Sequence, residues 1–300
     1  MDPWLAENDM SGKSWMRILA CLGILVGLGL AAPAAALAWG PGMHLALGKQ
    51  ILSNLHLLGP AVAELLTYNP RAFLYGCLSA DILVGKGRRI TPTHCHSWQA
   101  GLRMVQSVRN PRLQAYAYGY LTHLAADVVA HNYYVANILQ LGRTRGKLTH
   151  VYVEMQADRQ TSYCPTELKR VMKTSFPDAD ALLLSTLRKS RVAFSLKKRI
   201  FKSGVALSRN MTTTSSLELL SKQFPHQECG EYLSDMHELS FQVSMDCLIK
   251  GQKSAVITFD PMGFENLGLV KQHGGKRSAN SLTGSVMNFF IPTMSLLTLL

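Results

Sequence analysis

With 300 residues, 47% of them hydrophobic, the chain has enough apolar side chains for the core of one large domain or of two small ones. Its formal net charge of +12 indicates either acidic partners, such as anionic lipid, phosphate esters or nucleic acid, or a surface that simply keeps the protein soluble. The cysteines lie at scattered spacing, which excludes a zinc-finger pattern.

The first 38 residues have the pattern of an export signal that is removed from the mature protein. Lys13 and Arg17 precede an apolar run over residues 18–31, which is short for a membrane span. The A-L-A sequence at residues 36–38 fits a cleavage site, so we expect Trp39 to be the mature N-terminus. The alternative is an uncleaved N-terminal anchor. In an exported protein the remaining cysteines, at positions 77, 95, 164, 229 and 247, allow one or two disulfides.

Helical periodicity begins directly after Trp39. Leucine and isoleucine recur at helical spacing between residues 45 and 55, with His44 at or near the start of this helix. Residues Pro60–Tyr68 predict a second, short helix, which the Asn-Pro pair at 69–70 ends. The first part of the mature chain is therefore predicted to be helical.

Asp81 stands among the apolar residues of the stretch Ala72–Val84, where a carboxylate is unusual. It is either a functional residue, a helix cap or the partner of a basic residue in the following loop, residues 85–93. That loop leads to a histidine, a cysteine and a second histidine. Two histidines that flank one residue rarely both bind the same metal ion, so we expect one ligand here, either His94 or His96.

The sharpest motif lies in the central apolar stretch Ala115–Val135, where His123, Asp127 and His131 form the pattern H-x-x-x-D-x-x-x-H. The stretch is compatible with a helix, and residues four apart share one face of a helix. Three such groups on an apolar helix need partners, and neutral imidazole and carboxylate are standard zinc ligands. The alternative is hydrogen bonding among them inside an all-α core.

A second pair with the same spacing follows the central stretch. His150 and Glu154 lie four residues apart in a helix-like segment, with Asp158 one turn further on. Alone, such a pair is common on protein surfaces. After the H-x-x-x-D-x-x-x-H pattern, it indicates a second helix face that carries two metal ligands.

Beyond residue 165 the sequence predicts helices but no site. We expect helices over Pro177–Arg191, Val192–Leu207, Leu217–Phe224 and Glu231–Lys250. Seven basic residues between positions 188 and 202 are compatible with an anionic membrane surface or with an ordinary solvated helix face. Residues 285–300 are apolar but too short to span a bilayer. Because period-two alternation is nearly absent, the predicted fold is all-α.

The order of these residues resembles the zinc-dependent phospholipase C family, whose fold is shared with the S1/P1-type nucleases of fungi and plants. The resemblance covers residues 39–158. It implies an all-α, multi-helix bundle with three zinc ions, and an exported phosphodiesterase, periplasmic or secreted, that hydrolyses phospholipid head groups with a zinc-activated water. It is carried by Trp39, His44, Asp81, His94 or His96, His123, Asp127, His131, His150 and Glu154.

The resemblance also implies three ligand sets. The first comprises the amino group and carbonyl of Trp39, together with His44 and Asp127. Asp127 would bridge to the second, which comprises Asp81, His123, and His94 or His96. The third comprises His131, His150 and Glu154. Asp81 is in addition the candidate general base.

Three details of spacing bear on the substrate. The gap between Asp127 and His131 is shorter than in the secreted bacterial phospholipases C and resembles the branch that contains glycosylphosphatidylinositol-specific phospholipase D. The spacing of five from Trp39 to His44 is similar to the nucleases and to that phospholipase D. Glu154 stands where the nucleases usually have aspartate. Together these features favour phospholipid over nucleic acid and leave C-type and D-type cleavage open.

The sequence therefore predicts a signal peptide (1–38), a zinc-binding catalytic helical core (39–165), and a C-terminal part (166–300). The C-terminal part is either a helical extension of the same domain or a small second helical region. The expected partner is phospholipid or a membrane surface. The alternative functions are an S1/P1-type nuclease or nucleotidase, and a non-catalytic lipid-binding module that zinc stabilises.

Overall fold

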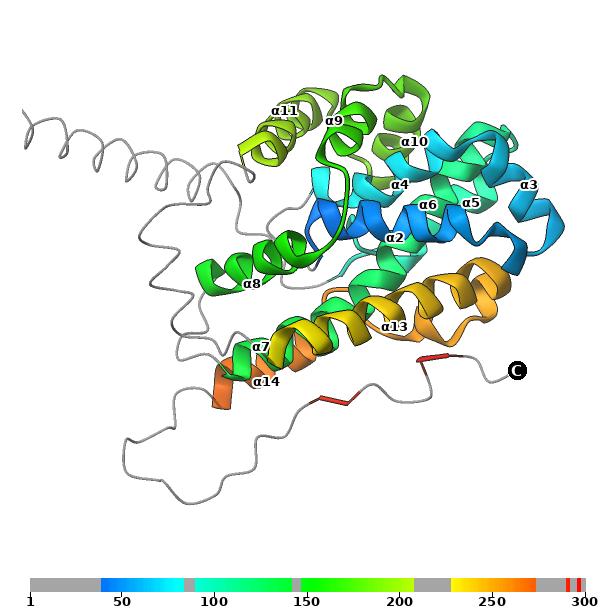
Figure 1. The fold of residues 1–300 in the computed structure, drawn as a ribbon. Coiled ribbons are helices and arrows are strands. Elements are labelled where there is room, and N and C mark those ends of the chain that lie inside the picture. The colour runs from blue at the N-terminus through cyan, green and yellow to red at the C-terminus, as the bar shows by residue number, and fades with distance from the viewer. Residues whose placement is uncertain are drawn as a thin grey trace, which may run out of the picture. The chain divides into compact units, whose positions relative to one another are not determined.

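The computed structural model describes residues 39–83, 90–141, 147–207, 228–273, 290–291 and 296–297, and every regular element among them is a helix (Figure 1). The predicted all-α class is therefore confirmed for the described part of the chain. These residues all belong to one compact unit, Ala36–Leu300. The predicted signal segment, the helix expected over Leu217–Phe224 and most of residues 285–300 lie outside the described residues.

The described part of the chain is built from helices and short helical turns. The α-helices are α2 (Pro41–Ser53), α3 (Pro60–Tyr68), α4 (Pro70–Ile82), α5 (Trp98–Ser107), α6 (Pro111–Val129), α7 (Val135–Leu141), α8 (Lys147–Gln160), α9 (Pro165–Lys173), α10 (Pro177–Leu187), α11 (Arg191–Leu207), α13 (Glu228–Lys250) and α14 (Phe264–His273). Shorter helical turns are η2 (Leu55–Leu57), η3 (Ala130–Tyr134), η4 (Gly251–Lys253) and η5 (Ala255–Thr258).

The helix α6 is central, and it packs most extensively against α4, with α13 and α5 on other sides. Two glycines allow α4 and α6 to cross at very short range. A Cβ atom on Gly76 would lie 2.1 Å from the backbone oxygen of Tyr116, and one on Gly119 would lie 2.0 Å from that of Phe73. The close crossing brings the last turn of α4, which carries Asp81, beside the metal-ligand motif of α6.

The central stretch is not one regular helix. The helix α6 begins with a capped turn, where the Asn110 side chain accepts hydrogen bonds from the backbone N–H groups of Arg112 and Leu113. It ends at Val129 and passes into η3, a single π-helical turn, before α7 continues. The extra residue in a π turn rotates the side chains that follow it. His131 lies within this turn, four residues after Asp127.

Sequence periodicity located most helices but missed some boundaries. The helix expected over Pro177–Arg191 ends at Leu187, because Arg188 adopts the left-handed conformation (φ 54°) that commonly terminates helices. Neither α9 nor α14 was predicted. None of the described helices is long and apolar enough to cross a membrane.

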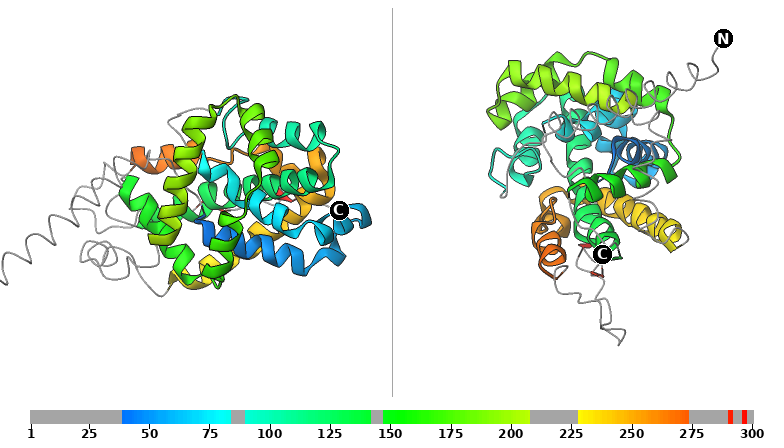
Figure 2. Two further views of the ribbon diagram at one scale, coloured as in Figure 1. Left: turned by 90° about the horizontal axis from the view of Figure 1, so that it is seen from above. Right: turned by 90° about the vertical axis from the view of Figure 1, so that its left-hand side faces the viewer.

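Helices from the second half of the chain pack on both sides of the central group. The helix α9 contacts α2 and α4, and α11 contacts α4 and α9. The helix α13 lies against α6 and α2, and α14 lies against η3 and α7. Figure 2 shows α10 and α11 on one side of the group and α13 and α14 on the other. The domain boundary predicted at residue 165 falls between α8 and α9, whose neighbours belong to the same compact unit.

Candidate metal centre

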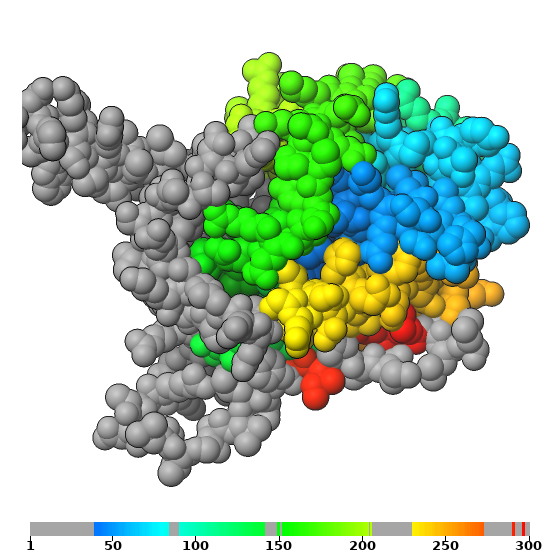
Figure 3. Space-filling model, viewed as in Figure 1, coloured from blue at the N-terminus to red at the C-terminus, as the bar shows by residue number. Residues whose placement is uncertain are grey.

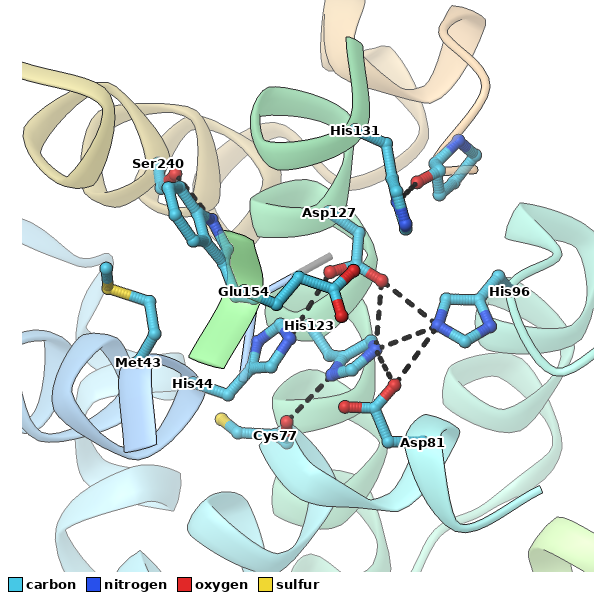
Figure 4. Close-up of polar contacts among 12 residues, drawn as sticks. Met43, His44, Cys77, Asp81, His96, His123, Asp127, His131, Glu154 and Ser240 are labelled. Atoms are coloured by element: carbon cyan, nitrogen blue, oxygen red, sulfur yellow. Dashed lines mark hydrogen bonds and ion pairs between the residues drawn. The ribbon is translucent and has the colours of Figure 1, made fainter. Parts of the chain in front are cut away.

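Side chains from six segments converge beside the C-terminal half of α6, and Figure 4 shows most of them. All of the converging side chains are buried. They are His44 from α2, Asp81 from α4, His96 from the loop before α5, His123 and Asp127 from α6, His131 from η3, and His150 and Glu154 from α8.

The carboxylate of Asp127 faces a different group with each of its oxygens. Oδ1 lies 3.2 Å from His44 Nε2. Oδ2 lies 3.0 Å from His96 Nε2 and 3.1 Å from His123 Nε2. Asp127 is therefore placed as the shared member of two adjoining donor sets, which is the arrangement of a bridging carboxylate.

Asp127 Oδ2 and three neighbouring atoms form a compact set. The Nε2 atoms of His96 and His123 are 3.1 Å apart. Asp81 Oδ1 lies 3.5 Å from His96 Nε2 and 3.6 Å from His123 Nε2. Ligands at zinc-binding distance in a tetrahedron are about 3.4 Å from one another. The spacing of these four atoms matches that edge length.

A further set comprises side chains of η3 and α8. Donor atoms of His131, His150 and Glu154 lie within 4.8 Å of one another. His150 Nε2 is 2.7 Å from Glu154 Oε1, and the rings of His131 and His150 meet edge to face. This set has three protein donors, which is the number typical of zinc sites that keep a position open.

These residues fit zinc because their polar atoms are close together but mostly lack hydrogen-bond partners. Buried polar atoms are nearly always hydrogen-bonded, and leaving one unpaired costs about 1–3 kcal/mol. So many unpaired atoms at one place indicate that a cation completes the site. The buried atoms without a hydrogen bond include His44 Nε2, both oxygens of Asp81, Asp127 and Glu154, His131 Nε2 and His150 Nε2.

Backbone carbonyls fix the orientation of two imidazoles. His123 Nδ1 lies 2.9 Å from the carbonyl oxygen of Cys77, and His131 Nδ1 lies 2.6 Å from that of Pro261. A carbonyl only accepts, so each Nδ1 donates a proton. Each Nε2 is then left with a lone pair that faces the cluster, as metal-binding histidines require.

The turn over residues 259–264 is a part of the site that the sequence did not predict. The carboxylate of Asp260 accepts hydrogen bonds from the backbone N–H groups of Met262 and Phe264. Gly263 has φ 56°, and a Cβ atom there would lie 2.7 Å from the His131 backbone. The D-P-M-G sequence is a turn pattern, but only the fold shows that this turn holds His131.

Electrostatics in the cluster favour the neutral, metal-binding form of three imidazoles, whereas neighbouring groups outweigh burial and raise the pKa of His96 and of His123. Burial lowers the pKa of His44 and of His131, and it lowers the pKa of His150 to about 3. Burial opposes ionisation of Asp127, but the neighbouring imidazoles outweigh it and hold its pKa well below the usual value. Burial, together with the charges of Asp81 and Asp127, raises the pKa of Glu154. A bound cation would reverse that last effect.

The start of α2 is held by α8. The first backbone N–H groups of this helix donate to Asp158, from Gly42 at 2.9 Å and from Met43 at 2.8 Å. The fully buried Trp39 indole donates to Ser240 Oγ of α13 at 3.2 Å. The helix that carries Glu154 thus also fixes the position of His44. The ligand role predicted for the Trp39 amino group and carbonyl stays a prediction.

His94 does not join the cluster. It is only partly buried, and its Nδ1 accepts a hydrogen bond from the backbone N–H of His96 at 3.1 Å. His96 is fully buried, and its Nε2 faces Asp81 and Asp127. Cys95 Sγ lies 3.3 Å from the other ring nitrogen of His96, which could make these three residues a separate small donor group. The contacts with Asp81 and Asp127 favour His96 as the ligand.

We therefore expect different outcomes for the two histidines. His96→Ala should lose zinc from the set that contains Asp81, and hydrolytic activity with it. His94→Ala should keep the zinc content of the parent protein at saturating zinc, with metal affinity reduced by about a hundredfold at most, as for other residues that only orient a ligand. Elemental analysis of both purified variants checks this. If His94→Ala loses zinc and His96→Ala does not, then His94 is the ligand and His96 is not.

Four cysteines have described side chains, and none of them forms a disulfide. Cys77, Cys95 and Cys247 are buried free thiols, and Cys164 is an exposed one. The disulfides that the sequence allowed are therefore absent among these four. The side chain of Cys229 lies outside the described residues.

An all-α fold around a buried cluster of imidazole and carboxylate donors defines a metalloprotein of the zinc type. Residues 43–199 match the family described as zinc dependent phospholipase C, and the chain belongs to this family. The predicted family is thereby confirmed, and membership implies a zinc-dependent hydrolase of the phospholipase C type. Searches among curated proteins and among solved structures returned no match.

Proposed function

We propose that the protein is an exported zinc-dependent phosphodiesterase that hydrolyses phospholipid head groups at a three-zinc site. The observation that carries the proposal is the buried cluster of adjoining imidazole and carboxylate donors, most of whose polar atoms lack hydrogen-bond partners. Membership of the zinc dependent phospholipase C family supports the reaction type. Export is supported by the signal pattern of residues 1–38.

Each of the three sets would hold one zinc. The first comprises His44, Asp127 and, after cleavage of the signal, the amino group and carbonyl of Trp39. The second comprises Asp81, His96, His123 and Asp127. The third comprises His131, His150 and Glu154. Zinc bound there would act as a Lewis acid toward the phosphoryl oxygens and would lower the pKa of a coordinated water to near neutral.

The protein's own side chains prepare this chemistry. Asp127 keeps two sets adjacent, because each of its oxygens faces a different one. The hydrogen bonds to Cys77 and Pro261 hold two imidazoles in fixed orientations. Asp81 Oδ2 has no hydrogen-bond partner, so it is available to accept the proton of the attacking water as general base.

Phospholipid is the favoured substrate class. Glu154 sets this chain apart from the nucleases, and the short gap from Asp127 to His131 resembles the branch that contains glycosylphosphatidylinositol-specific phospholipase D, as described above. The net charge of +12 suits an anionic bilayer surface, although it suits nucleic acid equally well. The choice therefore rests on the ligand pattern and on the matched family.

A substrate comparison tests the proposal. The mature protein beginning at Trp39 and loaded with zinc should hydrolyse phosphatidylcholine, and a chelator should abolish the activity. Diacylglycerol with phosphocholine as products would indicate C-type cleavage, and phosphatidic acid with choline would indicate D-type cleavage. Turnover of single-stranded DNA instead would establish a nuclease. No turnover of either substrate, with zinc bound, would establish a non-catalytic zinc-stabilised module.

A further inference from the structure

The positive charge of the chain is concentrated in one region. Residues 165–205 contain ten basic and three acidic residues, and so carry more than half of the net charge of +12. This region comprises α9, α10 and α11. The helix α11 lies at the upper edge of the molecule in Figure 3. Positive charge that is concentrated on a few adjoining helices indicates a surface that binds an anionic partner. Charge that only keeps a protein soluble would be distributed over the whole surface.

The inward side of α11 is anchored to the core by lysines. Lys198 Nζ lies 2.6 Å from Asp180 Oδ2 and over the ring of Tyr75, 4.8 Å from its centroid. Lys197 Nζ donates to the carbonyl oxygen of Leu83 at 3.3 Å. Leu83 is two residues beyond Asp81, so α11 is attached to the end of α4 that carries part of the metal centre.

The outward side of α11 exposes large aliphatic side chains beside arginines. Val192 is 82% exposed, and Leu196, one turn further, is 61% exposed. Arg191 and Arg199 are exposed beside them. Apolar side chains at the centre of an exposed face, flanked by cations, are the pattern of helices that lie in a membrane interface. We call Arg191, Val192, Leu196 and Arg199 the α11 face.

We infer that the α11 face binds the surface of a bilayer that contains anionic phospholipid. The aliphatic side chains enter the boundary between head groups and acyl chains, and the arginines meet lipid phosphates. Nucleic acid is less favoured, because single strands stack on aromatic side chains and the α11 face has none. The choice of phospholipid rests on the proposed function, whereas the binding itself is independent of turnover.

Vesicle sedimentation tests the inference with the mature zinc-loaded protein. Vesicles of phosphatidylcholine with phosphatidylglycerol should bind the protein more tightly than vesicles of phosphatidylcholine alone, and added salt should weaken the binding. The double variants Val192→Ser with Leu196→Ser, and Arg191→Glu with Arg199→Glu, should each weaken binding to the mixed vesicles by about tenfold or more. Both double variants should hydrolyse a short-chain monomeric phosphatidylcholine at the rate of the parent protein.

Matched control variants separate this surface from general effects. Ile249 of α13 is 54% exposed, and Arg71 at the start of α4 is exposed. Ile249→Ser and Arg71→Glu should bind vesicles like the parent protein. Parent-like vesicle binding by both α11 double variants would overturn the inference. It would also be overturned if these variants lost DNA binding but still bound vesicles. If the α11 double variants lose vesicle binding and the parent protein hydrolyses no substrate, the docking surface is upheld and the proposed function is refuted.

Discussion

Asp127→Asn should lose two zinc ions and lower phosphodiester hydrolysis by about three orders of magnitude or more, since zinc supplies several kcal/mol of transition-state stabilisation. The reason is the placement of its two oxygens, with Oδ1 facing His44 and Oδ2 facing His96 and His123. Asparagine keeps the shape but loses the charge that two cations would share. Elemental analysis of the mature protein, with circular dichroism to confirm the fold, measures the loss.

Glu154→Gln provides the comparison. Glu154 belongs only to the set with His131 and His150, so this variant should lose one zinc and keep the pair around Asp127. Asp178→Asn changes an exposed acidic residue outside the cluster and should keep the full metal content. Equal zinc losses in Asp127→Asn and Glu154→Gln would show that the three sets are grouped wrongly.

Gly119→Ala should lower the free energy of unfolding by about 3 kcal/mol or more. The added Cβ atom would lie 2.0 Å from the Phe73 backbone oxygen, 2.9 Å from its carbonyl carbon and 3.0 Å from the Cys77 nitrogen. These are backbone atoms of α4, so they can move away only if the two helices separate. The separation would also shift the Cys77 carbonyl that orients His123.

Urea denaturation at fixed zinc concentration measures this effect, and another glycine supplies the control. Gly268 lies in α14, and a Cβ atom there would meet no atom within 4 Å. Gly268→Ala should therefore stabilise the protein by about 0.5–1 kcal/mol, because alanine is the better helix former. If Gly119→Ala behaves like Gly268→Ala, the close crossing of α4 and α6 is not required for stability.

Much of the site was predictable because its residues recur at helical spacing. His123 with Asp127, and His150 with Glu154, stand four apart on α6 and α8, as the pattern indicated. The buried position of Asp81 within α4 agrees with its unusual place among apolar residues. Local periodicity therefore located the helices and the side chains that converge at the cluster.

Other parts of the site depend on contacts between distant segments, which local pattern does not contain. The spacing of His94 and His96 did not show which ring turns inward. The π turn at η3 leaves no mark on the apolar pattern, and that pattern did not show that His131 meets His150 and Glu154 of α8. A glycine inside a helical pattern lowers helix propensity, whereas in the structure Gly119 allows α4 and α6 to approach closely.

The orientation of His131 depends on the turn over residues 259–264, which is synthesised late. His131 donates to Pro261, which follows it by 130 residues and lies beyond the matched family region that ends at residue 199. Ribosomes deliver the chain from its N-terminus, so the residues around Asp127 are present long before this turn exists. His131 is therefore oriented only after this turn has been made, and a chain that stops short of residue 259 lacks the acceptor that orients it.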